Sequence, residues 1–125
     1  MYFTTKNYEE ARKSLERIEN RSLKLNIAYQ KILYYLGVEK MNRGEYEQAI
    51  EFFDIAIKED YVRSVKIDAE FWKAEAYFRL LSYDLSVEAY EKFLFEPGAI
   101  SSAYYTLAQY NLGYAHYRKK DYKSA

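Results

Sequence analysis

The side chains best suited to catalysis or metal binding are scarce in this sequence. It has no cysteine and a single histidine, His116, so neither a thiolate nucleophile nor a histidine and cysteine metal set can be assembled. No glycine-rich phosphate loop and no nucleophile-elbow motif is present. We expect His116 to be a packed, hydrogen-bonded residue on a core-facing helix position. The sequence therefore predicts no catalytic residue, no metal site and no cofactor, and we expect no enzyme activity.

Tyrosine is the abundant residue whose chemistry suits binding. The chain has 16 tyrosines, each with an apolar ring and a polar tip, a combination favoured at interfaces. Its 19 basic and 19 acidic residues balance, which argues against a nucleic-acid partner and against a strongly anionic membrane surface. The longest apolar run, residues 32–38, is too short to insert across a membrane. The composition therefore favours a protein or peptide partner.

Four tyrosines recur at nearly constant spacing. Tyr8, Tyr46, Tyr83 and Tyr122 are 38, 37 and 39 residues apart. Each is followed after three residues by a small side chain, and the first three have a large apolar one four residues further on. Nine residues before each of the last three tyrosines stands another small residue. The small positions are Ala11, Ala49, Ser86 and Ala125, the large ones Leu15, Phe53 and Tyr90, and the upstream ones Gly37, Ala74 and Gly113.

This spacing indicates pairs of antiparallel helices. Small residues let two helices approach closely, and large apolar residues fill the space beside the contact. One such pair cannot bury its apolar face alone, so successive pairs must stack.

The pattern resembles the tetratricopeptide repeat, whose motif runs Trp-x2-Leu-Gly-x2-Tyr, then Ala-x3-Phe, then Pro. Three copies match it in part. The first copy has Lys40 where the motif has tyrosine, the second lacks the leucine of the motif, and the third has His116 at the tyrosine position. The matching residues are Leu33, Leu36, Gly37, Ala49, Phe53 and Ala56; then Ala74, Tyr77, Ser86, Tyr90 and Pro97; then Leu112, Gly113, Tyr122 and Ala125.

The resemblance implies an all-α, right-handed α-α superhelix that works as a scaffold. The period of 37 to 39 residues exceeds the usual 34 of the family. In this it is similar to repeats of bacterial envelope proteins, which favours an envelope or periplasmic location, although the cytoplasm stays open. Related helical-hairpin repeats with overlapping periods are the alternative fold.

We expect one domain over residues 1–125. It comprises the second helix of an incomplete repeat (7–20), two repeats (22–59 and 62–97) and a further incomplete repeat (100–125). This division suggests a fragment of a longer array.

Several helix boundaries are predicted by local signals. Gly44 is a natural helix terminator, and the Glu96-Pro97-Gly98 segment breaks the chain. We expect a long helix over residues 100–119 after that break. Tyr122 would then open another helix.

In the family, the first helices of successive repeats line a concave binding face. The corresponding residues form an aromatic set with one arginine at matching places in two repeats, typical of interface hot spots. The hypothesis is a groove that grips a peptide by apolar side chains, with Arg79 and Arg118 contacting acidic groups. The alternative is that the rings only pack neighbouring helices together. The residues are Tyr34, Val38, Met41, Asn42, Phe71, Glu75, Phe78, Arg79, Tyr110, Tyr114, Tyr117 and Arg118.

A second hypothesis is structural. The first helix carries an apolar stripe, Ala11, Leu15 and Ile18, that needs a neighbour. That neighbour is a preceding repeat or another copy of the chain, which would give a homodimer through the incomplete terminal repeats or end-to-end stacking.

Overall fold

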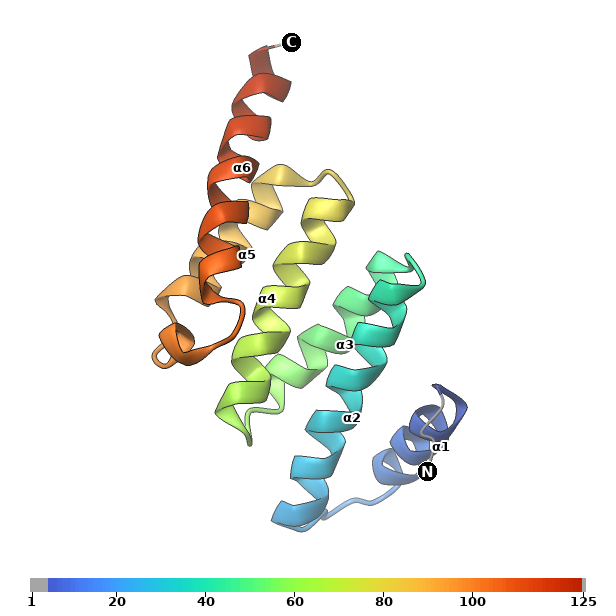
Figure 1. Cartoon of the computed structure of the whole chain (residues 1–125). Helices are drawn as coiled ribbons and strands as arrows, with labels where there is room; N and C mark the ends of the chain where they lie inside the picture. Colours follow the sequence, from blue (N-terminus) through green and yellow to red (C-terminus); the bar gives the residue numbers. More distant parts are fainter. Residues whose placement is uncertain (1–4, 125) are drawn as a thin grey trace.

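The computed structural model describes the backbone of residues 5–124 and the side chains of residues 7–120. These residues form six α-helices and one short 3-10 turn, with no strand among them (Figure 1). The elements are α1 (Thr5–Glu16), α2 (Leu23–Asn42), α3 (Tyr46–Lys58), α4 (Arg63–Arg79), α5 (Tyr83–Phe95), η1 (Ala99–Ser101) and α6 (Tyr105–Ser124).

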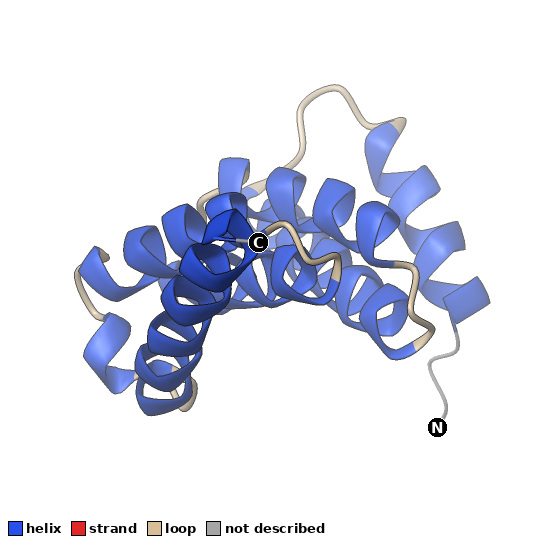
Figure 2. Cartoon of the chain, turned by 90° about the horizontal axis from the view of Figure 1, so that it is seen from above, coloured by secondary structure: helices blue, strands red, loops and turns tan. Residues whose placement is uncertain are grey.

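Consecutive helices run antiparallel and pack side by side along the chain. Each helix from α2 to α5 contacts the one before it and the one after it, and α2 also contacts α4. Seen from above, the row of helices bends into an arch (Figure 2). The prediction of an all-α solenoid of helix pairs is confirmed.

Two of the helix pairs turn by the same backbone device. Gly44 and Leu81 both have positive φ, 78° and 63°, and each lies two residues before the tyrosine that opens the next helix. The N–H of Gly44 donates to the carbonyl of Met41, and the following N–H donates to that of Lys40. Leu81 and its neighbour make the equivalent bonds to Phe78 and residue 77. A leucine at positive φ costs about 1–2 kcal/mol, so packing must enforce this second turn.

Within each pair, a small residue on the first helix receives a ring from the second. A Cβ built on Gly37 would lie only 2.5 Å from Cε1 of Phe53, a ring that is fully buried. In the next pair Ala74 and Tyr90 occupy the corresponding places, and both are fully buried. The predicted small and large positions therefore form the helix contact inside each pair.

The loop between α3 and α4 is held by one buried amide. Gln30, on α2, is fully buried. Its Nε2 donates to the carbonyls of Ala56 and Val62, and its Oε1 accepts from the N–H groups of Tyr61 and Val62, the last at 2.7 Å. This amide ties one helix pair to the start of the next.

The first helix is shorter than predicted. It ends at Glu16, whereas the sequence suggested a helix to about residue 20. The Arg21 guanidinium donates to the carbonyl of Leu15 at 3.0 Å and lies 4.3 Å from the ring of Tyr29, so the chain turns early toward α2. Ile18 is consequently outside the helix and 40% exposed.

The last helix also differs from the prediction at both ends. It begins at Tyr105, after the 3-10 turn, because Ser102 Oγ accepts from the N–H of Tyr104 and donates to Asp68. At the other end, α6 continues through Tyr122 without a break, so the prediction of a new helix there is wrong.

Candidate functional site

Helices α2, α4 and α6 carry all twelve residues predicted to line the binding face, and the structure places them at different depths. Met41, Phe71 and Glu75 are buried, and Tyr34, Val38, Phe78 and Arg118 are half-buried. The exposed ones are Asn42, Arg79, Tyr110, Tyr114 and Tyr117.

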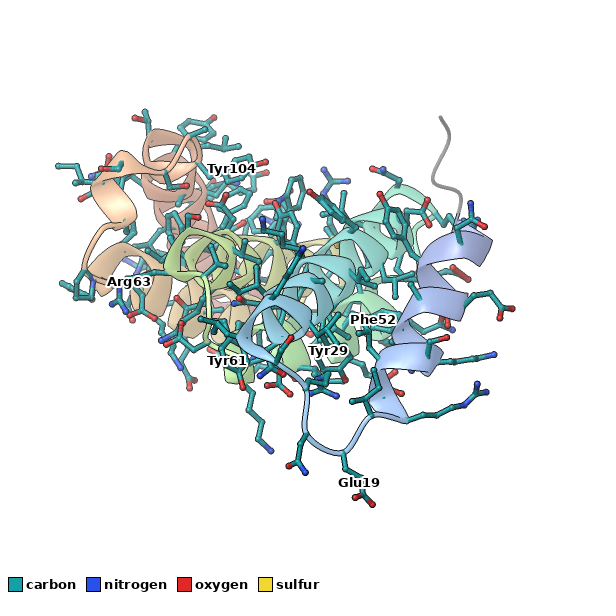
Figure 3. All side chains as sticks on the ribbon, turned by 90° about the horizontal axis from the view of Figure 1, so that it is seen from below. Glu19, Tyr29, Phe52, Tyr61, Arg63 and Tyr104 are labelled. Atoms are coloured by element: carbon teal, nitrogen blue, oxygen red, sulfur yellow. The ribbon has the colours of Figure 1, made fainter. Side chains whose placement is uncertain are left out.

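A first group of rings joins α2 to α4 and to the residue just before α6. We call Tyr34, Phe71, Trp72 and Tyr104 the first ring cluster. Phe71 and Tyr104 stack with centroids 4.6 Å apart, and Trp72 Nε1 donates to the hydroxyl of Tyr34 at 3.1 Å. Burial, with a smaller contribution from Tyr104, raises the pKa of Tyr34 well above its usual range. Tyr29, on the same helix as Tyr34, does not belong to this cluster: Figure 3 shows it far from Tyr104, and its hydroxyl donates to Glu16 of α1. The first ring cluster serves mainly to hold helices together.

Glu75 is the acceptor of a buried network. Its Oε1 accepts from the Tyr90 hydroxyl at 2.8 Å and from Asn111 Nδ2 at 3.0 Å, and its Oε2 accepts from Arg79 Nε at 3.2 Å. Burial and the Glu75 carboxylate raise the pKa of Tyr90 far above its usual range. These bonds join α4, α5 and α6, so Glu75 is engaged within the fold.

A second group of rings lies where α4 meets α6, and part of it is open to solvent. This second ring cluster consists of Phe78, Tyr83, Tyr114 and Tyr117. The centroid of Tyr114 lies 5.6 Å from Phe78 and 6.4 Å from Tyr117. The guanidinium of Arg118 lies 5.8 Å from the Tyr83 ring centroid. Tyr114 and Tyr117 are 43% and 65% exposed, so a cation and two accessible rings stand together.

A cavity of about 520 Å³ lies between the end of α2, the start of α3 and α4. Three predicted residues, Met41, Asn42 and Arg79, line it together with Tyr46 and Trp72. Arg79 keeps its side chain 55% exposed while it bonds to Glu75. The cavity can therefore offer a guanidinium beside aromatic walls.

The exposed large apolar side chains of α6 fall on one stripe. Leu107, Tyr110, Tyr114 and Tyr117 follow the helical spacing of three, four and three residues, and each is at least 43% exposed. The neighbouring face of α6, around Gly113, is polar and open: a Cβ added at Gly113 would meet nothing within 4 Å. On α2 the equivalent face is covered by α3. The other residues of that face of α6 are Thr106, Gln109 and His116.

Sequence reasoning missed Trp72, Tyr104 and Asn111. Trp72 could have been found, because it is the single tryptophan and is adjacent to the predicted residue Phe71. The contacts of Tyr104 and Asn111 depend on how the segment that contains α6 approaches α4, which the sequence does not show. His116 was predicted to be packed, and this is wrong. Its side chain is 52% exposed, with Nε2 4.0 Å from Glu91 Oε2 of α5, because it lies on the open face of α6 around Gly113.

Residues 5–124 include no helix long and apolar enough to span a membrane. The same part of the chain shows no group of three or more histidine, cysteine or carboxylate residues arranged to hold a metal ion.

Comparison with known protein families shows that residues 34–104 match a family model described as the tetratricopeptide repeat. Neither the curated proteins nor the solved structures give a match. The matched segment begins in α2 and ends just before α6, so it contains both ring-to-small-residue contacts described above.

Proposed function

Because this chain belongs to the tetratricopeptide repeat family, whose repeats are generally non-catalytic protein–protein interaction modules, we propose that it is a scaffold that binds a peptide or a partner protein on the face formed by α2, α4 and α6. The proposal includes the division into repeats 22–59 and 62–97, flanked by incomplete repeats 7–20 and 100–125.

The observation that carries the proposal is the exposed aromatic stripe of α6. Tyr110, Tyr114 and Tyr117 remain 71%, 43% and 65% exposed, although burying such rings normally stabilises a fold. Aromatic side chains dominate the binding energy of many interfaces. The rings stand on a helix whose backbone is already ordered, so a partner that covers them has only their side-chain rotations to restrict.

The charged groups beside these rings indicate what the partner carries. Arg118 lies against the second ring cluster, and Arg79 lines the cavity next to it. An arginine recognises a carboxylate with two parallel hydrogen bonds. The preferred ligand is therefore a peptide segment that presents apolar side chains to the tyrosines and an acidic group to each arginine.

The test is a selection of binding peptides from a random-sequence display library, followed by affinity measurements on variants. We expect Tyr114→Ala and Arg118→Glu to weaken the selected peptides at least tenfold. Tyr61→Ala is the matched control, because Tyr61 is also 43% exposed but lies in the loop between α3 and α4. Peptides that bind Tyr114→Ala as tightly as the original chain would refute the proposed face.

Self-assembly is the second candidate, and one observation favours it. In the preceding repeats, the positions equivalent to Tyr110 are covered by the next first helix or by the residue just before it: Trp72 of α4 bonds to Tyr34, and Tyr104, just before α6, stacks on Phe71. A second copy of the chain could cover the α6 stripe in the same way. The molar mass by light scattering over a concentration series tests this. A molar mass that rises with concentration for the original chain, but stays at the monomer value for Tyr110→Ser, supports stacking. A constant monomer mass for the original chain rules it out.

A further inference from the structure

The aromatic stripe of α6 is a straight row of side chains that suits an elongated partner. Leu107, Tyr110, Tyr114 and Tyr117 follow one another on one side of the helix. At about 1.5 Å of rise per residue, the row extends over about 15 Å. A partner that covers all four side chains therefore has to run along α6.

The stripe offers rings but few groups that could bind the backbone of a peptide. The N–H and carbonyl groups of α6 are used within the helix, and the Asn111 amide is bound to Glu75 at 3.0 Å and to the Tyr90 hydroxyl at 3.3 Å. An extended peptide pressed onto the rings would bury its own N–H and carbonyl groups without partners, which costs free energy. An α-helix satisfies its own backbone, so it can present side chains alone.

The fold itself covers the equivalent ring of α2 with a helix. Tyr34 stands three residues before Gly37, as Tyr110 stands three residues before Gly113. Trp72 of α4 lies against this ring and donates to the Tyr34 hydroxyl at 3.1 Å. A face of this kind therefore accommodates a helix that packs along it.

Charged side chains near the two ends of the face give that helix a direction. Arg79, the last residue of α4, keeps its side chain 55% exposed, and Arg118 lies toward the end of α6. Nearer the other end, Asp68 accepts from Ser102 at 2.8 Å; burial first, and Asp68 among the lesser causes, raise the pKa of Tyr34, which places Asp68 on the same face.

These charges match the preferences of a helix that runs antiparallel to α6. Acidic side chains stabilise the first turn of a helix, and basic side chains stabilise the last turn. In the antiparallel direction, the first turn of the partner lies beside Arg79 and Arg118, and its last turns lie toward Asp68. In the parallel direction, each pairing would require a side chain at the unfavourable end of the partner helix.

We propose that this face binds an amphipathic α-helix of a partner protein, antiparallel to α6, with acidic residues in its first turn beside Arg79 and Arg118 and a basic residue toward its end beside Asp68. Its apolar side chains lie against Tyr110 and Tyr114. The inference rests on the proposed function, because it specifies the conformation, direction and charge pattern of a partner for the same face.

The experiment measures the binding of three synthetic peptides to the full chain by fluorescence anisotropy. The first is a stapled amphipathic helix of about 18 residues, the length of the stripe with one further turn at each end, with glutamates in its first turn and lysines in its last turn. The second exchanges the two charged ends. The third has the first sequence without the staple and with central prolines, which prevent the helix. We expect the first peptide to bind at least about tenfold more tightly than either of the others.

A nitroxide label on the first peptide reports its direction. Placed in the first turn, the label should broaden the amide NMR signal of Tyr117 more than that of Leu107, and placed in the last turn it should do the reverse. The opposite pattern would mean a parallel helix, the direction that α4 takes against α2, and would overturn the proposal (Figure 1).

A charge exchange tests the arginine contact. Arg118→Glu should weaken the first peptide and strengthen the second, which narrows the difference between them to about threefold or less. Lys13→Glu is the matched control, because Lys13 is exposed on α1 and the variant has the same change of charge. It should leave the preference for the first peptide unchanged. Thermal unfolding checks that both variants are folded.

Equal affinities of the first and second peptides, full affinity of the proline peptide, or no binding of the first peptide would each overturn the helix. The library peptides separate this failure from that of the proposed function. If their binding depends on Tyr114 but tolerates a central proline, the face is retained and the helix is refuted. If no selected or designed peptide depends on Tyr114, the proposed function itself fails.

Discussion

Replacement of Gln30 tests how one side chain holds two helix pairs together. Of the backbone groups that it binds, the N–H of Val62 has no other acceptor among the described residues, whereas Tyr61 N–H also donates to Glu59. Gln30→Ala leaves the N–H of half-buried Val62 without a protein partner, which costs about 1–3 kcal/mol if water does not replace the amide. The other three bonds add roughly 0.5 kcal/mol or more each at the low end of the usual range.

We therefore expect Gln30→Ala to lower the free energy of unfolding by roughly 2.5–4.5 kcal/mol, with Val62 as the largest single contribution. Urea unfolding monitored by circular dichroism measures the change. Amide hydrogen exchange should accelerate at Val62 more than in the middle of α3. Gln48→Ala is the matched control, because Gln48 is exposed on α3 and should change the stability by less than about 0.5 kcal/mol.

A loss below about 1 kcal/mol for Gln30→Ala would refute this reasoning, because it would mean that water or a shifted loop satisfies Val62 equally well. Equal exchange rates at Val62 in both proteins would refute it independently of the stability measurement.

Further predictions follow from the helix contacts and the buried acids. Gly113→Ala should stabilise the chain by about 0.5–1 kcal/mol, since the added methyl meets nothing, whereas Gly37→Ala should destabilise it in the same urea assay. Tyr90→Phe removes a donor from the buried Glu75 carboxylate and should cost roughly 1.5–3 kcal/mol in urea unfolding; an unchanged midpoint would contradict it. The raised pKa of Glu70 penalises its ionised form in the folded chain, so stability relative to Glu70→Gln should fall as pH rises from about 4.5 to about 8. Thermal midpoints of both proteins at pH 5 and pH 9 check this, and parallel pH profiles would contradict it.

The repeat register and most helix boundaries could be read from short stretches of sequence. Gly44 supplies the positive φ that ends α2, and Gly98 does the same in the break after α5. The small residue at Gly37 and the large one at Phe53 mark a helix contact because only that combination lets two backbones approach closely. Such signals are local or repeat at a fixed spacing, so no knowledge of the folded shape is needed.

The tertiary structure alone decided which aromatic and charged residues stay exposed. Phe71 and Tyr110 occupy equivalent repeat positions, yet the first is 1% and the second 71% exposed, because Tyr104 stacks on Phe71 whereas no described residue covers Tyr110 in that way. Glu70 looked like an ordinary helical acid until the approach of α5 buried it beside Glu96. Burial depends on neighbours that lie a whole repeat away in the sequence, and helical periodicity carries no information about whether those neighbours are present.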